Sequence, residues 1–176
     1  PLFEWMSNRD VIGDQSASNK NYEKLAGLLP AEVFKKILWV FQGGDLQMLK
    51  DYASASTRIG IGGLVPYSTD YQALRAIVDK IAPIVQESGA KAHLFGCTSY
   101  KMLKWLGFEE WFESVDSTRW LHGIKSKEII FQSGKKGSAT ELGLMLSTDE
   151  LSRHNIRVLN WFINPDVNSM QLELVA

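Results

Sequence analysis

The sequence of 176 residues has one cysteine, no long apolar run and no clear excess of either charge. The single Cys97 excludes an internal disulfide framework and is typical of a chain that works in the reducing cytoplasm. The longest apolar runs, such as residues 37–41, are far shorter than the about 20 residues that a bilayer-spanning helix needs. The first residues carry no basic region before an apolar core, so no signal peptide is expected. These absences predict a cytoplasmic chain with no membrane span.

Signatures of cofactor and metal binding are absent as well. Neither the dinucleotide motif G-x-G-x-x-G nor the P-loop follows any predicted strand. The cysteine and the three histidines lack the spacing of metal ligands, and we interpret His93 as a core histidine within an apolar strand. The 19 Lys and Arg nearly balance the 20 Asp and Glu, so only a local patch would attract nucleic acid. We therefore expect no cofactor and no metal ion.

The sequence does contain ample material for one folded domain. Hydrophobic residues make up 45% and charged residues 22%, which is typical of globular proteins. The length fits a single domain and is below the about 250 residues of a complete (β/α)8 barrel. Short β-branched and aromatic runs alternate with longer amphipathic stretches, a pattern typical of an α/β protein with a parallel sheet. We thus predict a single α/β domain over residues 1–176.

Five strands and five main helices are predicted from this alternation. The strands are Leu2–Met6, Ile37–Phe41, Arg58–Ile61, Ala92–Phe95 and Phe112–Val115. The helices are Ser18–Leu29, Asp45–Tyr52, Asp70–Glu87, Tyr100–Leu106 and Thr148–Phe162, with caps expected at Ser18, at Ser68 or Thr69, and at Thr148 or Asp149. Beyond residue 120 the pattern is weaker and indicates a further strand at Glu128–Phe131 and a loop at Ser133–Ser138.

Glycine and polar residues gather directly after the last four predicted strands. The segments are Gln42-Gly43-Gly44, Gly62-Gly63, Gly96-Cys97-Thr98 and Asp116-Ser117-Thr118. The carboxyl ends of parallel strands meet at one edge of a sheet, and ligand sites of α/β sheets and barrels lie at that edge. The carboxyl edge is therefore the candidate site.

The same strand ends resemble one known family. Phe41-Gln42-Gly43-Gly44, Ile61-Gly62-Gly63-Leu64-Val65, His93-Leu94-Phe95-Gly96 and Val115-Asp116-Ser117 are similar, in order and spacing, to the last barrel units of the tRNA-guanine transglycosylases, or queuine tRNA-ribosyltransferases. The segment Asp10-Val11-Ile12-Gly13-Asp14 and the Ser-Val-Asp-Ser form of the last motif are closer to the phage and prophage DpdA-like enzymes, which insert 7-deazaguanine bases into DNA. The resemblance covers roughly residues 5–121.

The resemblance implies a TIM-barrel fold of which this chain supplies the C-terminal part. Residues 1–121 would be barrel units with about five strands, and residues 122–176 would be a C-terminal loop and helix. The first three barrel strands, and the general base that the family draws from them, would come from elsewhere. Three alternatives stay open: the chain is a fragment, another chain or a dimer mate completes the barrel, or the protein is a degenerate relative.

The resemblance also implies an enzyme, a pentosyltransferase that exchanges guanine for a 7-deazaguanine in nucleic acid. Asp116 matches the nucleophilic carboxylate, which forms a covalent aspartyl-glycosyl intermediate until the incoming base displaces it. The sequence lacks the C-x-C-x-x-C zinc motif of the transfer-RNA enzymes, which favours DNA over tRNA as the substrate. The structural alternative is that Asp116 caps a turn through the amides of Ser117 and Thr118.

The base-binding positions of the family match Asp10, Gln42, Gly62, Gly63, Leu64 and Phe95. Asp10, or its rival Asp14, would accept the N1–H and N2–H of the purine, and the Gln42 amide would bind the purine edge. The Gly-Gly-Leu segment would present backbone N–H groups to O6, and Phe95 would stack on the flipped base. The alternatives are ordinary turn residues, a tight glycine turn and a core phenylalanine.

A basic run is the candidate nucleic-acid-binding surface. It consists of Arg119, Lys125, Lys127, Lys135 and Lys136. The alternative is a solvated face without a partner. Two further functions stay open for the whole chain. One is a non-catalytic subunit that binds nucleic acid or the base and completes a barrel with another chain. The other is an unrelated α/β barrel enzyme whose glycines bind phosphate.

Overall fold

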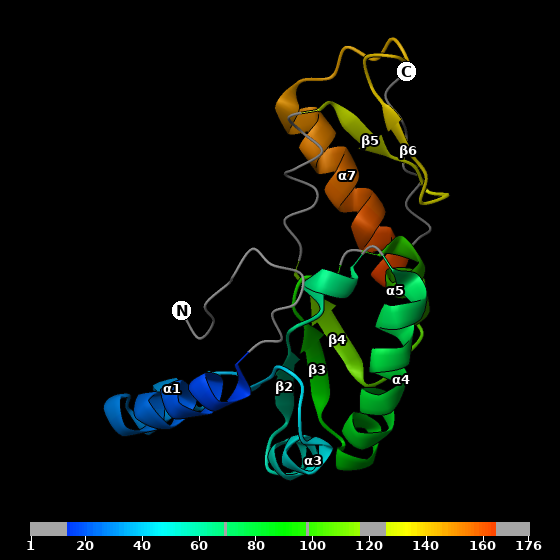
Figure 1. Cartoon of the computed structure of the whole chain (residues 1–176). Coiled ribbons are helices and arrows are strands. Elements are labelled where there is room, and N and C mark those ends of the chain that lie inside the picture. The colour runs from blue at the N-terminus through cyan, green and yellow to red at the C-terminus, as the bar shows by residue number, and fades with distance from the viewer. Residues whose placement is uncertain (1–13, 69, 98, 117–125, 165–176) are drawn as a thin grey trace. The chain divides into compact units, whose positions relative to one another are not determined.

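The structure is a computed structural model that describes residues 14–68, 70–97, 99–116 and 126–164. Its larger sheet has four parallel strands, β1 (Val40–Phe41), β2 (Arg58–Ile61), β3 (Lys91–Leu94) and β4 (Phe112–Val115). The strands lie side by side in the order in which they occur in the chain, and Figure 1 shows this for β2, β3 and β4. The predicted α/β class with a parallel sheet is confirmed.

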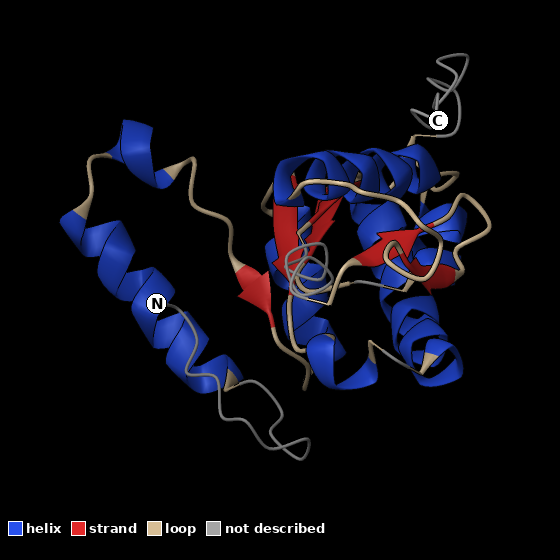
Figure 2. Ribbon diagram, turned by 90° about the horizontal axis from the view of Figure 1, so that it is seen from above, coloured by secondary structure: helices blue, strands red, loops and turns tan. Residues whose placement is uncertain are grey.

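Helices alternate with these strands along the chain; Figure 2 draws the helices in blue and the strands in red. Helices α1 (Gln15–Leu28) and α2 (Ala31–Phe34) precede β1, α3 (Leu46–Ser54) joins β1 to β2, and η1 (Val65–Tyr67) with α4 (Tyr71–Ser88) joins β2 to β3. Helix α5 (Tyr100–Leu106) joins β3 to β4, and the strands β5 (Glu128–Ile130) and β6 (Lys136–Ser138) and the helix α7 (Thr148–Ile163) come after β4. In the described ranges, no helix combines the length and the apolar character needed to cross a membrane.

The chain divides into two compact units. The first unit contains α1 to α4 and the parallel sheet, within residues 1–97 and 110–116. The second unit contains α5, the β5–β6 hairpin and α7, within residues 98–109 and 117–176. The strand-end residues of the candidate site belong to the first unit, with two exceptions. Position 98 and the positions after 116 belong to the second unit. The single domain expected from the length stays a prediction.

The parallel sheet has two different faces because side chains alternate along each strand. One face packs against α3 and α4 and is formed by buried apolar residues, Ile59, Ile61, Ala92 and Leu94. The other face, which we call the histidine face, carries Val40, Gly60, His93 and Ser114 opposite one another in the four strands. The first face supplies the core, and the histidine face carries the polar side chains.

Helix α4 illustrates why the connections are helical. Its Asp70 cap accepts hydrogen bonds from the amides of Gln72 and Ala73 at 3.0 Å, which satisfies two of the free N–H groups of the first turn. Apolar residues then recur at helical spacing and are buried, at Leu74, Val78, Ile81 and Val85. The helix ends at Gly89, whose φ of 73° is the left-handed conformation that favours glycine.

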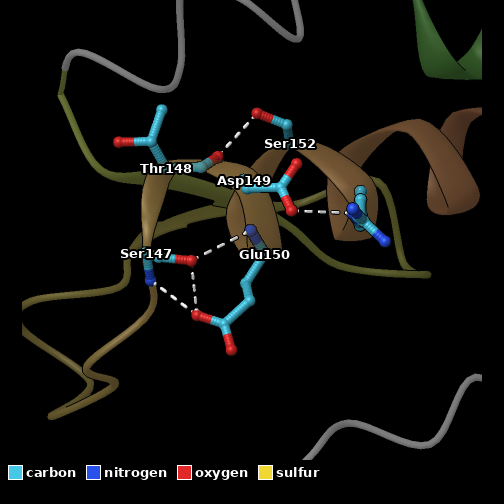
Figure 3. A network of polar contacts seen from close by, with 6 residues as sticks. Ser147, Thr148, Asp149, Glu150 and Ser152 are labelled. Carbon is cyan, nitrogen blue, oxygen red and sulfur yellow. Dashed lines mark hydrogen bonds and ion pairs between the residues drawn. The ribbon is translucent and has the colours of Figure 1, made fainter.

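The helix starts differ from the sequence predictions at three points. Helix α1 begins at Gln15 with Asp14 as its cap, not with Ser18, which is buried inside the helix. Helix α4 is capped by Asp70, one residue after the predicted Thr69, which lies outside the described residues. Helix α7 is capped by Ser147 in a reciprocal capping box with Glu150 (Figure 3), not by Thr148 or Asp149. Each observed cap is the residue whose side chain reaches the amide two or three positions ahead.

The predicted loop at Ser133–Ser138 is partly wrong. Residues Lys136–Ser138 form β6, which pairs antiparallel with β5. Gly134, with a φ of 78°, supplies the turn that brings the two strands together. The buried amide of Asn155 on α7 holds β5, because it accepts from the Ile130 N–H and donates to the Glu128 carbonyl, each at 2.9 Å. The predicted strand Leu2–Met6 lies outside the described residues.

Candidate functional site

The predicted strand-end segments meet at the carboxyl edge of the parallel sheet. The ladder aligns the last residues of the four strands, Phe41, Ile61, Leu94 and Val115. The residues that follow them lie in one row on the histidine face, in the order Gln42, Gly62, Phe95 and Asp116. Neighbouring strands are about 4.8 Å apart, so about 14 Å separates the two ends of the row.

Asp116 is exposed at the end of β4, and the neighbouring loop holds its carboxylate. The Gly96 N–H donates a hydrogen bond to Asp116 Oδ1 at 2.6 Å. Gly96 has a φ of 69°, and a Cβ at this position would lie 2.2 Å from Val65 Cγ2, so glycine is required there. The hydrogen bond from the β3 loop orients the carboxylate along the edge of the sheet. The alternative partners, Ser117 and Thr118, lie outside the described residues.

Gln42 is buried beneath α1. The residue is 5% exposed, and its Nε2 lies 3.5 Å from Ser18 Oγ. A Cβ on Gly62 would come within 2.8 Å of Gln42 Oε1, so the amide lies over this glycine. The Gln42 side chain is therefore next to the glycine segment, as the motifs predict, but it already packs against a helix.

The side chain of Gln15 covers the free edge of β1. Its Oε1 accepts from the Gln42 N–H at 2.6 Å, and its Nε2 donates to the Val40 carbonyl at 3.2 Å. These are the backbone groups, two residues apart, that a neighbouring parallel strand would use. Nothing in the sequence pattern identified Gln15, because a glutamine in the first turn of a helix has no distinctive spacing relative to a strand 25 residues later.

The glycine segment after β2 has one amide committed to the sheet. The Gly62 N–H donates to the Phe41 carbonyl at 2.7 Å, which leaves it unavailable to a purine oxygen. Gly63 has a φ of 71°, and Leu64 is 1% exposed. In the described part of the chain, no acceptor takes the N–H of Gly63 or of Leu64. Because Leu64 is buried, the amide of this segment that is left to bind a ligand atom is that of Gly63, which is partly exposed.

Phe95 lies on the histidine face and is partly exposed. A Cβ on Gly60 would lie 2.8 Å from Phe95 Cε2, so the phenyl ring packs over this glycine. The ring also contacts the imidazole of His93, with centroids 4.4 Å apart and the planes inclined by 68°. Phe95 is thus a surface-facing aromatic at the candidate site and not a fully buried core phenylalanine.

His93 is not a buried core residue either. Its Nδ1 lies 2.9 Å from Ser114 Oγ on β4, and the imidazole is half-buried. Burial lowers the pKa of His93 below the ordinary imidazole value, the negative charges of Asp116 and Glu113 oppose that shift, and the positive charge of Arg58 adds to it. The neutral imidazole is therefore favoured at neutral pH.

The remaining predicted site residues are Asp10, its rival Asp14 and the basic run. Asp10, Arg119 and Lys125 lie outside the described residues. Asp14, the rival of Asp10, accepts from the Ala17 N–H at 2.9 Å as the cap of α1. Of the described basic residues, Lys127 donates to the Leu146 carbonyl at 3.3 Å, Lys136 pairs with Glu128, and Lys135 is exposed. These three lysines belong to the second unit.

The described residues offer no metal site. Within residues 14–68, 70–97, 99–116 and 126–164, no three His, Cys, Asp or Glu side chains lie close enough together to hold a metal ion. Cys97, in the loop after β3, is a free cysteine and is fully buried.

Comparisons with protein families, with curated proteins and with solved structures found no match to this chain. The relationship to the transglycosylases therefore stays a prediction based on the strand-end motifs.

Proposed function

We propose that the chain forms part of a transglycosylase-type (β/α)8 barrel that replaces guanine with a 7-deazaguanine in nucleic acid. The proposal rests on the row of Gln42, Gly62, Phe95 and Asp116 at one edge of a parallel sheet. The strand order β1-β2-β3-β4 also fits, because consecutive barrel units are neighbours whereas doubly wound sheets reverse their order. Further strands, from this protein or another chain, would close the barrel.

The order of the row supports a base that lies over β2 and β3. The amide of Gly63 would bind the purine O6, and the ring of Phe95 would stack on the base. This arrangement would direct C1′ of the sugar toward Asp116, which directly follows β4. Base exchange requires the target nucleotide to leave the helical stack.

Asp116 would act as the nucleophile in two steps. Its free oxygen would attack C1′ while the C1′–N9 bond breaks and guanine leaves with the bonding electrons. The hydrogen bond from Gly96 to Oδ1 would orient the carboxylate for this attack. The departing guanine would take up a proton at N9, and the incoming 7-deazaguanine would give up its N9 proton as it displaces the carboxylate from C1′, so that the exchange releases no net proton. No cofactor is needed for this chemistry, and a cytoplasmic location would give access to the nucleic acid.

The test is release of labelled guanine from DNA by the purified chain, together with any chain that copurifies with it, in the presence of a 7-deazaguanine base. Asp116→Asn is expected to lower the exchange rate by about 10³-fold or more, because it removes the nucleophile. Asp70→Asn is a matched control, since asparagine also caps a helix well. A covalent adduct between the wild-type chain and DNA should be visible by mass spectrometry. Full activity of Asp116→Asn would exclude the assignment, and the same assay with tRNA compares the two substrates.

A non-catalytic base-binding subunit is the second candidate. It is favoured by the engagement of the Gln42 side chain with Ser18 of α1. The same assay separates the two candidates. Binding of a 7-deazaguanine base without guanine release or adduct formation supports the subunit.

A further inference from the structure

A polar cluster on the histidine face lies directly below the row that ends in Asp116. His93 and Ser114 are opposite each other in β3 and β4, and Asp116 follows Ser114 two residues later on the same face. The ion pair between Arg58 Nε and Glu113 Oε2, at 2.7 Å, joins β2 to β4. The proposed reaction gives no role to these four side chains, His93, Ser114, Arg58 and Glu113.

A β-bulge creates the contact between His93 and Ser114. The ladder pairs Ala92 with Phe112 and then His93 with Ser114, so that one residue of β4, Glu113, is left without a partner in β3. Without this shift, Glu113 would lie opposite His93. The bulge therefore puts a neutral hydroxyl next to the imidazole and directs the Glu113 carboxylate to Arg58.

We propose that His93 is a positioning residue of the exchange site, oriented by Ser114, which holds the Phe95 ring in place and supports base exchange only while it is uncharged. This inference rests on the proposed function, and it adds a residue and a pH dependence to it. The Ser114 hydroxyl fixes the imidazole through Nδ1, and the imidazole contacts the Phe95 ring at a centroid distance of 4.4 Å. The ring that would stack on the base is thereby held between His93 and Gly60.

The charge of His93 matters because the Asp116 carboxylate follows on the same face of the sheet, where the sugar would react. The transition state of base exchange carries positive charge on the sugar, which the Asp116 carboxylate must stabilise. A protonated imidazole about two residues away along the sheet would attract the same carboxylate and repel the sugar. At that distance we expect a rate loss of about tenfold or more.

The charged groups around His93 come from all three strands. Arg58 lies on β2, and Glu113 and Asp116 lie on or directly after β4. Lys91, two residues earlier on β3, donates to the Glu110 carbonyl. Burial lowers the pKa of His93, which keeps the uncharged form dominant at neutral pH and puts the loss of activity on the acid side.

The test is the pH profile of guanine exchange for the wild-type chain and for His93→Asn, from about pH 5 to 8. Asparagine can still bond to Ser114 but never becomes charged. The wild-type rate is expected to fall at least about tenfold on the acid side, and the His93→Asn rate to be flat over that range. His154→Asn, which alters a histidine bonded to the Ile130 carbonyl, is the matched control and should keep the wild-type profile.

Superimposable profiles of the wild type and His93→Asn would overturn the inference while leaving the proposed function intact. Loss of all exchange in a folded His93→Asn protein would also overturn it, because the residue would then be essential rather than positioning. If His93→Asn does not fold, the inference is tested by NMR titration of the His93 imidazole in the wild type and in Asp116→Asn. The midpoint should fall when the Asp116 charge is removed, and an unchanged midpoint would overturn the inference. Absence of exchange in the wild type at every pH would instead overturn the proposed function itself.

Discussion

Gly63 is one of the glycines at which the backbone of the candidate site is constrained. Its φ of 71° is left-handed, and a Cβ there would lie 3.0 Å from the Gln42 carbonyl oxygen. Gly89 has a similar φ of 73°, but nothing lies within 4 Å of its Cβ position. Alanine at Gly89 would therefore experience only the strain of the left-handed backbone. Alanine at Gly63 would experience that strain and a close contact as well.

We predict that Gly63→Ala destabilises the protein more than Gly89→Ala does. Gly89→Ala should cost about 1–2 kcal/mol, the usual penalty for a non-glycine residue in this conformation. Gly63→Ala should exceed that value, because the methyl group must also displace a backbone carbonyl. The entropy that alanine removes from the unfolded chain is the same at both positions. Urea unfolding measures both changes, and equal losses would show that the close approach to Gln42 is unimportant.

His93 predicts a pH dependence of stability that is separate from any activity. Burial lowers its pKa in the folded state, so below the ordinary imidazole value of about 6.5 the unfolded chain binds more protons than the folded one. The contribution of His93 to stability is thus fully present above about pH 6.5 and is lost as the pH falls through the folded pKa. The wild type should lose more free energy of unfolding between pH 7.5 and 5.5 than His93→Asn. Parallel losses in urea titrations of the two proteins would contradict this assignment.

At the residue scale, the sequence predicted where the candidate side chains lie better than what they touch. Gln42, Gly62 and Asp116 follow β-branched or aromatic runs, and this pattern was sufficient to place them at one edge. The contact of His93 with Ser114 was not predictable, since it depends on a bulge that shifts the register between strands about 20 residues apart. A helix residue that covers a strand edge, such as Gln15, also leaves no local pattern.

The side chain of Gln15 links two elements, α1 and β1, at an otherwise unpaired edge. Gln15→Leu keeps the size of the side chain but leaves the Val40 carbonyl and the Gln42 N–H without their partner. We expect a loss of about 1–3 kcal/mol in the free energy of unfolding, which is typical of unsatisfied, largely buried polar groups. Urea unfolding and gel filtration measure the effect, since an uncovered strand edge also promotes association.

Gln47→Leu is the matched control for this change. Gln47 is exposed on α3 and donates to Asp51 one turn away at 2.8 Å, so its replacement should change stability by less than about 0.5 kcal/mol. A loss in Gln15→Leu as small as that in Gln47→Leu would mean that water replaces the amide at the β1 edge.

The elements themselves were predictable where local pattern and packing agree. The bounds of β2, β4 and α5 match the sequence predictions, because each of these apolar segments is followed by a glycine or an aspartate. The strand β6 was missed, since Lys-Gly-Ser has little intrinsic preference for a strand and pairs only because the Gly134 turn presents it to β5. The helix starts were displaced because several neighbouring Ser, Thr and Asp residues compete as caps.

For the whole molecule, the sequential strand order determines which two strands lie at the edges of the sheet. It leaves the edge of β4 without a partner strand within the described residues, and the edge of β1 is covered only by Gln15. The α/β class followed from the alternation of elements, but closure into a barrel did not, because it depends on strands that pair at these edges. The resemblance set residues 122–176 apart from the barrel units, close to the start of the second unit's longer segment at residue 117, but it did not predict that residues 98–109 belong to that unit as well.

A base ligand should act on only one of the two units. All described base-binding candidates belong to the first unit, and the β5–β6 hairpin belongs to the second. A 7-deazaguanine base at 100 times its dissociation constant would stabilise the first unit by about 2.7 kcal/mol, which slows amide exchange there by about 100-fold. Hydrogen exchange should therefore slow at the amides of Gly62 and Phe95, which bond within the sheet, and not at Ile130 of the hairpin. Adenine, which presents a different hydrogen-bonding edge, is the control. Equal slowing in both units would show that they open together and would contradict this prediction.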